Sequence, residues 1–459
     1  MSALPTRIES QAGRSLTAAE VFEITRAREK SLSGLLILYI TTGLTFMLLP
    51  GTFLGVWNLL AISSHRAASS VSAGWVQAHG HAQIFGWIGT FILGIGFYSI
   101  PKLRRSHPFA LWAAWSCWAL WTAGITLRWL TGVYQWHWRV LLPVSAALEL
   151  IAFLIFFSSV SGHRPQESGK GSLEKWVAVV IAAAIGLLAT LLVNLGASLF
   201  LAARGISPDL PPAFDQRFLV LETWGFLVPF VWGFSAKWLP VFLGLRPIRE
   251  GWLLVTVGVN SSGVLIAMAG WITFATIALC GGILISALAL RLLEPIQQPA
   301  KIKGVHPSFP VFIRLAYLWG MVAAVLGIWA SLVPDSHGIW GASRHALTVG
   351  FLAMMVFSVG QRILPAFSGM RLLFSTKLMF GSLSLLAIGC LLRVSSEIVA
   401  YQEFATWAWS WLPVSAVIEM TAVTSFAVNL LGTFLSQPLS QNLPSIRTRK
   451  ESRGHASGL

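Results

Sequence analysis

The sequence predicts an all-α polytopic membrane protein with about twelve transmembrane helices, and two observations carry this prediction. Of the 459 residues, 55% are hydrophobic and only 11% are charged, whereas a soluble protein of this length needs roughly 25% charged residues to cover its surface. The apolar residues also gather in blocks of about 20, which is the length of helix that crosses a hydrocarbon core. Backbone polar groups in lipid must be satisfied within their own segment, so we expect these blocks to be helices.

Polar stretches divide the apolar sequence into its separate spans. The expected spans are residues 33–56, 75–101, 108–130, 139–160, 176–203, 217–240, 251–270, 273–292, 311–333, 342–365, 376–394 and 408–433. The first block is too long for the core of a signal peptide, so we interpret it as a retained helix. The sequence thus predicts one transmembrane domain, 33–433, between polar segments at 1–32 and 434–459.

The basic residues are distributed unequally between the two sets of connecting segments. The set that contains both termini holds 25 of the 32 Lys and Arg residues, and the opposite set holds seven. Cytoplasmic loops retain positive charge, so we expect both termini to lie in the cytoplasm. This distribution accounts for the net charge of +15, and we expect the lipid bilayer rather than nucleic acid as the partner.

One pattern recurs in the second helix of each third of the chain. A glycine is followed fifteen residues later by a proline at Gly86–Pro101, Gly225–Pro240 and Gly350–Pro365. A second repeated motif is present in the first and third units. It reads LPVSAALE, ending at Glu149, and LPVSAVIE, ending at Glu419. Because internal repeats reveal architecture, we predict three units of four helices. These units span about residues 33–160, 176–292 and 311–433.

Two histidines occupy the same position of this repeat. His81 and His345 each lie five residues before the repeat glycine, where the second unit has Val220. A histidine in a membrane helix marks a function or a buried partner, and neutral imidazole is a usual ligand of haem iron. We therefore predict that His81 and His345 hold a haem from facing helices. The alternative is a pair of buried histidines bonded to neighbouring carbonyl groups.

His79 forms an HGH sequence with His81. Two helical residues differ by about 200° of rotation, so the two imidazoles cannot easily serve one iron. Which of the two ligates the iron stays open, and His79 could instead bind a second metal or a haem propionate. Candidate partners for His79 at a copper ion are His65, His137 and His337. We call these the outer histidines, because they lie on the side of the membrane opposite the termini.

Buried charges complete the candidate site. Arg128 and Arg393 lie near the outer ends of the third helices, where they could bind haem propionates or anchor those helices at the interface. Glu149 and Glu419 fall near mid-bilayer, so each must be protonated or paired, as part of a proton path or as a structural hydrogen bond. No CxxCH motif for covalent attachment occurs, so we expect a b-type haem.

Two segments resemble the NnrS family of membrane haem and copper proteins. The run HGHAQIFGWIGTFILGIGFYSIPKL at 79–103 resembles the HxH segment of that family, and RHALTVGFLAMMVFSVGQRILPAFSG at 344–369 resembles its HALTVG segment. The resemblance implies a location in the bacterial inner membrane and a link to nitric oxide and nitrogen-oxide metabolism. It also implies a diatomic gas ligand and an electron donor as partners, and leaves open whether the protein is an enzyme.

The three units of four helices are also similar to subunit I of haem–copper oxidases, where helices two and ten ligate the low-spin haem. That similarity implies His345 with His79 or His81 as axial ligands. Ser343 replaces a second histidine of helix ten, and helices six and seven contain no histidine. We therefore expect no copper of the oxidase type and no reduction of oxygen at such a centre.

Two other functions stay open. A proton-coupled transporter or metal-handling permease would use the midplane glutamates, although twelve-helix transporters are commonly built as two halves of six helices. A structural respiratory subunit without cofactors is disfavoured by the two histidines at equivalent repeat positions.

Overall fold

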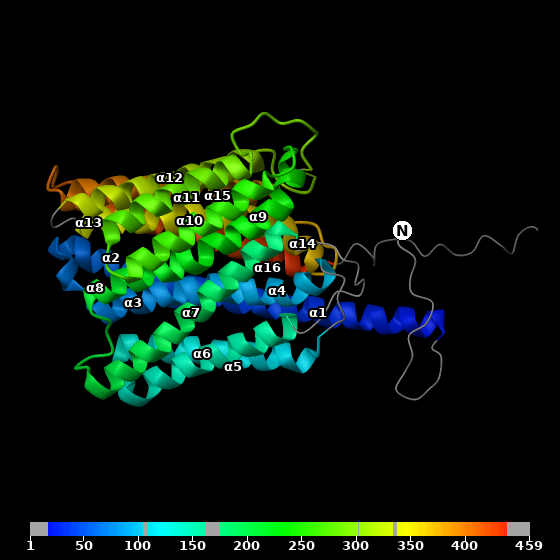
Figure 1. Ribbon diagram of the computed structural model, residues 1–459, viewed down its shortest axis with the longest axis horizontal. Coiled ribbons are helices and arrows are strands. Elements are labelled where there is room, and N and C mark those ends of the chain that lie inside the picture. The colour runs from blue at the N-terminus through cyan, green and yellow to red at the C-terminus, as the bar shows by residue number, and fades with distance from the viewer. Residues whose placement is uncertain (1–16, 104–108, 162–173, 302, 334–336, 438–459) are drawn as a thin grey trace, which may run out of the picture.

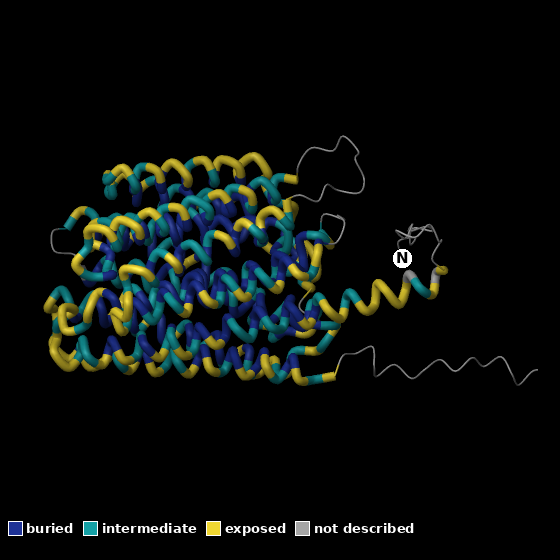
Figure 2. Tube along the Cα trace, turned by 90° about the horizontal axis from the view of Figure 1, so that it is seen from below, coloured by how far each residue is buried: buried dark blue, intermediate teal, exposed yellow. Residues whose placement is uncertain are grey.

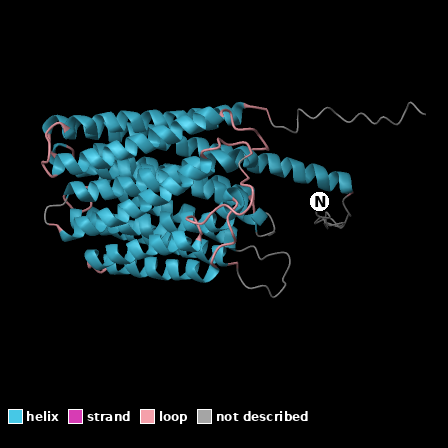
Figure 3. Cartoon of the chain, turned by 90° about the horizontal axis from the view of Figure 1, so that it is seen from above, coloured by secondary structure: helices cyan, strands magenta, loops and turns pink. Residues whose placement is uncertain are grey.

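The computed structural model describes residues 17–103, 109–161, 174–301, 303–333 and 337–437. Every regular element within these ranges is helical (Figure 3). Eleven helical spans in this part of the chain are long and apolar enough to cross a membrane. A further long helix, α5 (Leu111–Tyr134), has 24 residues and is rich in tryptophan. The predicted multi-pass all-α fold with about twelve spans is therefore confirmed.

The elements follow the order of the three predicted units. The first unit contains α1 (Ala18–Phe46), η1 (Met47–Phe53), α2 (Leu54–His65), the short turn η2 (Ala68–Ser70), α3 (Ala73–His81), η3 (Ala82–Gly89), α4 (Thr90–Leu103), α5 and α6 (Trp138–Ser161). The second contains α7 (Lys175–Arg204), α8 (Pro212–Val220), η4 (Leu221–Leu227), α9 (Val228–Leu243), α10 (Glu250–Met268) and α11 (Ile272–Ala289). The third contains α12 (Phe309–Leu332), α13 (His337–His345), η5 (Ala346–Ala353), α14 (Met354–Phe367), α15 (Thr376–Tyr401) and α16 (Ala408–Leu435).

The first helix begins well before the apolar block that we expected from residue 33. Thr17 accepts the N–H of Glu20 at 3.2 Å, and the Glu20 carboxylate accepts the N–H of Thr17 at 2.8 Å. This reciprocal capping box satisfies two donors that a helix start otherwise leaves free. The helix therefore includes residues 18–32 and extends beyond the bundle (Figure 1).

The three units close into a ring. The fourth helix of each unit packs against the first helix of the next, as α6 against α7 and α11 against α12. The ring is completed where α16 packs against η1 and α2, and Ser63 there donates to the carbonyl of Trp409 at 2.7 Å. The three units of four helices expected from the repeat therefore follow one another around a closed ring.

The second helices of the three units form the interior of the ring. In their most apolar stretches 83%, 61% and 72% of the residues are buried, whereas the other eight apolar spans reach at most 56%. Figure 2 shows the buried residues concentrated along the middle of the bundle. Side chains on these inner helices therefore face one another rather than lipid.

Each inner helix contains a π-helical segment at the same place in the repeat. The segments η3, η4 and η5 directly follow His81, Val220 and His345, and each contains its repeat glycine. The packing of Gly186 on α7 shows how tightly η4 lies against the first helix of the second unit. A Cβ added there would lie 1.8 Å from the carbonyl oxygen of Gly225. π-helical turns are rare and frequently occur at functional sites.

Candidate functional site

A cavity of about 510 Å³ lies between the inner helices. Its walls include α2, α3, α8 and α13, which gather at the end of the bundle opposite the start of α1 (Figure 1). Five predicted cofactor residues, His79, His81, His345, Arg128 and Arg393, all contribute to its lining. The fold thus brings residues from α3, α5, α13 and α15 to one space.

His79 presents an unprotonated nitrogen that could bind a metal. Its Nδ1 lies 2.8 Å from the carbonyl oxygen of Gly51 on η1. A carbonyl only accepts, so Nδ1 carries the proton and Nε2 keeps its lone pair. The ring lies close against Gly55, where an added Cβ would be 2.6 Å from Cε1 of His79. The first span therefore fixes both the tautomer and the position of this imidazole.

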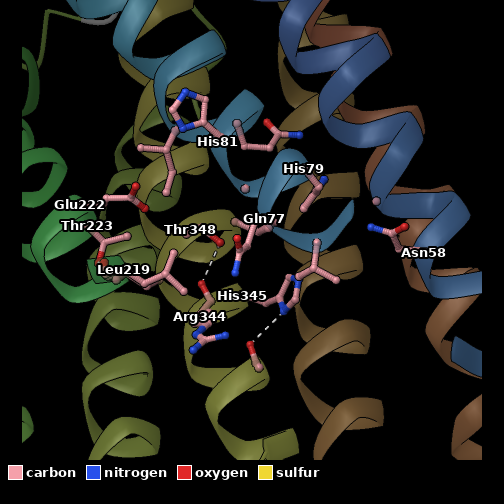
Figure 4. Close-up of a pocket in the computed structure, with 18 of the residues that line it drawn as sticks. Asn58, Gln77, His79, His81, Leu219, Glu222, Thr223, Arg344, His345 and Thr348 are labelled. Atoms are coloured by element: carbon pink, nitrogen blue, oxygen red, sulfur yellow. Dashed lines mark hydrogen bonds between the residues drawn. The ribbon is translucent and has the colours of Figure 1, made fainter. Parts of the chain in front are cut away.

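His345 has the same tautomer. Its Nδ1 lies 2.9 Å from the carbonyl oxygen of Gly341, one turn earlier on α13, which again leaves the Nε2 lone pair free. A second group approaches this nitrogen, because Oε2 of Glu397 lies 3.2 Å from it. Figure 4 shows His345 and His79 on neighbouring parts of the cavity wall.

His81 is arranged differently from the other two histidines. Its Nε2 shares a hydrogen bond of 2.8 Å with Oε1 of Glu149, and the ring stacks on Phe85 with centroids 4.5 Å apart. The side chains of His81 and Glu149 are 6% and 0% exposed. Figure 4 shows His79 and His81 on different sides of their helix, as the 200° rotation between them predicts. The assignment of His81 as an iron ligand stays a prediction, with Nε2 committed to Glu149.

The glutamates at the repeat positions share their packing but not their partners. Glu149 lies against Gly124 of the preceding helix, and Glu419 lies against Gly389 in the same way, with Cγ 2.8 and 2.7 Å from a Cβ added at each glycine. Glu149 is paired with His81. Oε2 of Glu149 and Oε1 of Glu419 are both buried without a hydrogen-bond partner among the described residues.

The two predicted arginines add positive charge to the cavity wall. Arg128 and Arg393 are each only 6% exposed. Nε of Arg393 lies 3.5 Å from Oε2 of Glu397, but Nε and Nη1 have no hydrogen-bond partner within the part of the chain that the structure describes. Buried guanidinium N–H groups without acceptors are costly, so Arg393 is suited to bind a carboxylate or phosphate in the cavity.

Four charged residues of the cavity were not among the predicted site residues. They are Asp215, Glu222, Arg344 and Glu397. The spacing of Arg393 and Glu397, four residues apart on one membrane helix, is the signal that could have identified the last of them. The other three lie on α8, η4 and α13, and only the meeting of these elements identifies them.

A short connection between α7 and α8 covers part of the cavity. Gln77 accepts the N–H of Leu210 at 2.9 Å and donates to its carbonyl at 3.0 Å. The neighbouring Asp209 is partly buried, and this desolvation raises the pKa of its carboxyl above the usual range. Its Oδ1 lies close against Gly74, where an added Cβ would be 2.6 Å away.

The structure brings neither His65 nor His137 into this lining. His65 ends α2, and His137 contacts the ring of Trp136 between α5 and α6. His337 begins α13, and its side chain lies outside the described atoms. Within the described ranges, no three His, Cys, Asp or Glu side chains are grouped to hold a metal ion. A copper ion at His79 stays a prediction.

Comparisons with known proteins bear on the fold. A family model described as a domain of unknown function, DUF8744, matches residues 244–433, and no curated protein matches the sequence. Among solved structures, a chain of a haem–copper terminal oxidase dimer superposes with a TM-score of 0.71 at 11% sequence identity. The alignment covers 89% of this chain and 84% of the oxidase chain. The protein is therefore a multi-pass membrane protein with a haem–copper oxidase-like fold.

Proposed function

We propose that the protein binds a b-type haem between His79 and His345. The observation that carries this proposal is that the two imidazoles have the same tautomer, with the proton on Nδ1. Each comes from an inner helix, lines the same cavity and is held through Nδ1 by a backbone carbonyl, which leaves Nε2 free. Haem-ligating histidines need this tautomer, and a second bond on the other nitrogen fixes the ring orientation.

The surroundings of the two histidines suit the group. A volume of about 510 Å³ falls within the range of about 300–1,000 Å³ found for cofactor pockets. The buried N–H groups of Arg393 and the guanidinium of Arg128 would bind the propionates. The haem–copper oxidase-like fold supports the same cofactor. When bound between two histidines, the haem would supply one-electron redox chemistry.

The proposed biological role is of the NnrS type, a response to nitric oxide or other nitrogen oxides in a bacterial inner membrane. It is supported by the two segments, 79–103 and 344–369, that resemble that family and contain both proposed ligands. The protein would bind a diatomic gas or pass electrons from a donor at the haem. His79 and His345 hold the iron in this proposal, and the arginines orient the macrocycle.

A visible spectrum of the purified protein tests the haem proposal. We expect a Soret band with sharp α and β bands after reduction, lost in His345→Ala and converted to a high-spin spectrum in His79→Ala. The variant His81→Ala should keep a six-coordinate low-spin haem, because His81 is bonded to Glu149. Colourless wild-type protein would contradict the proposal and favour the permease. A high-spin spectrum in His81→Ala alone would instead assign the iron to His81.

A further inference from the structure

The two proposed iron ligands have different partners on their second nitrogen. The proton on Nδ1 of His79 is directed at one neutral group, the carbonyl of Gly51 at 2.8 Å. The corresponding nitrogen of His345 lies 2.9 Å from the carbonyl of Gly341 and 3.2 Å from the carboxylate of Glu397. A carboxylate next to this N–H makes an imidazole more basic and a stronger metal ligand than a carbonyl does.

Glu397 is held in place for this contact. Its side chain is 7% exposed, and its Oε2 lies 3.5 Å from Nε of Arg393, one turn earlier on α15. That same oxygen has no hydrogen bond within the described residues. A buried carboxylate oxygen without a donor is costly, and Nδ1 of His345 is the N–H group that a small tilt of the ring would bring to it.

A glycine on α13 creates the space that this carboxylate occupies. A Cβ added to Gly341 would lie 2.0 Å from Oε1 of Glu397. Any larger residue at this position would displace the carboxylate from its place beside His345. The glycine therefore contributes twice, because its carbonyl accepts the proton of His345 and its missing side chain admits Glu397.

The repeat shows that this arrangement is specific to the third unit. In the first unit, the repeat histidine His81 bonds the repeat glutamate Glu149. In the third unit, His345 instead lies beside Glu397, and Oε1 of the repeat glutamate Glu419 is left without a hydrogen bond in the described chain. His345 therefore pairs with Glu397 and not with Glu419, the glutamate at the repeat position.

We infer that Glu397 is a positioning residue that strengthens His345 as an iron ligand. His79 would then be the weaker of the two ligands, and an incoming diatomic gas would displace it from the iron. The inference rests on the proposed function. It adds that His79 and His345 would hold the iron unequally, and that His79 would be the ligand displaced by a gas.

The inference is tested on the purified full-length haem protein by redox titration and by electron paramagnetic resonance of the ferric form. We expect Glu397→Gln to raise the midpoint potential and to change the low-spin g values with haem still bound. Gly341→Ala keeps the carboxylate but displaces it, so it should change the g values in the same direction. This second variant keeps the test decisive if Glu397→Gln does not fold.

Carbon monoxide tests the exchangeable face. The reduced His79→Gly variant should bind the gas faster than the wild-type protein, because no internal ligand must leave. His345→Gly should lose haem during purification, because the weaker ligand alone remains.

The matched control is Glu149→Gln, which neutralises the carboxylate paired with the repeat histidine of the first unit. It should leave the g values of the wild-type haem unchanged. The inference is overturned if Glu397→Gln and Gly341→Ala both retain wild-type g values and potential, or if Glu149→Gln reproduces their effect. Wild-type protein without haem would overturn the proposed function itself, so the two failures are distinguishable.

Discussion

Oε1 of Glu149 and Nε2 of His81 share a hydrogen bond of 2.8 Å, which joins two buried polar groups from α6 and α3. Replacing Glu149 by alanine leaves the imidazole without this partner inside the bundle. Breaking a buried pair in this way costs about 3–5 kcal/mol. We expect Glu149→Ala to lower the unfolding temperature in detergent strongly. Glu149→Gln keeps an acceptor oxygen and should cost only about 1–2 kcal/mol, so equal losses in both variants would argue against the bond.

The close approach of α7 and η4 gives a second prediction. A Cβ at Gly186 would overlap the carbonyl oxygen of Gly225 at 1.8 Å, which is backbone and cannot rotate away. Gly186→Ala should therefore separate the two helices at a cost of at least about 1–3 kcal/mol, measured as a lower unfolding temperature. Gly258→Ala on α10 is the control, because nothing lies within 4 Å of the added Cβ. That variant should be neutral or gain up to about 1 kcal/mol from helix propensity.

Asp209 gives a prediction of pH dependence. Burial raises the pKa of its carboxyl in the folded protein above its ordinary value of 3.8. Between these two pKa values the folded state binds more protons than the unfolded state, so the contribution of Asp209 to stability falls as pH rises. We expect Asp209→Asn to raise the unfolding temperature at pH 7 and to have no such benefit below the unfolded pKa. A benefit that is constant with pH would show that the carboxyl charge is not its cause.

The unpartnered N–H groups of Arg393 give a prediction about cofactor retention. Arg393→Leu removes the guanidinium that would bind a propionate, and outer-shell losses of this kind typically weaken affinity about 10–100-fold. The measurement is the ratio of Soret to protein absorbance during dilution into detergent. Arg204→Leu is the control, because this exposed residue ends α7 and does not line the cavity. Equal haem retention in both variants would contradict the assignment.

The fold could be predicted from the sequence because its determinants are local or periodic. Each span is an apolar block of sufficient length, and the three units follow from glycine–proline pairs at a constant spacing. Even the opposed directions of His79 and His81 follow from helix geometry alone. The start of α1 was missed because the capping box of Thr17 lies outside the apolar block.

The partners of the histidines could not be predicted, because they depend on how the helices meet. Nothing local indicates that the carbonyl of Gly51 bonds His79. Nor does the sequence indicate that Glu149 bonds His81 whereas His345 pairs with Glu397 rather than with Glu419. The π-helical segments could not be predicted either, because no residue pattern in the three units indicates a change from α to π geometry. The role of Glu397 depends on Gly341 of another helix, and only the packed structure places the two together.

The π-helical segments η3 and η5 have a consequence for insertions and deletions in this chain. Each segment accommodates extra chain within an otherwise regular helix, directly after His81 and His345. Deleting one residue there would let the segment return to α geometry while the helices before and after it kept their relative orientation, because the wider turns of a π-helix absorb about one extra residue. A deletion in the regular part of the same helix would instead turn the chain on one side of it by about 100° relative to the other. His79 and His345 should therefore stay at the cavity after a deletion within η3 or η5, and only the side chains of the segment itself would change direction.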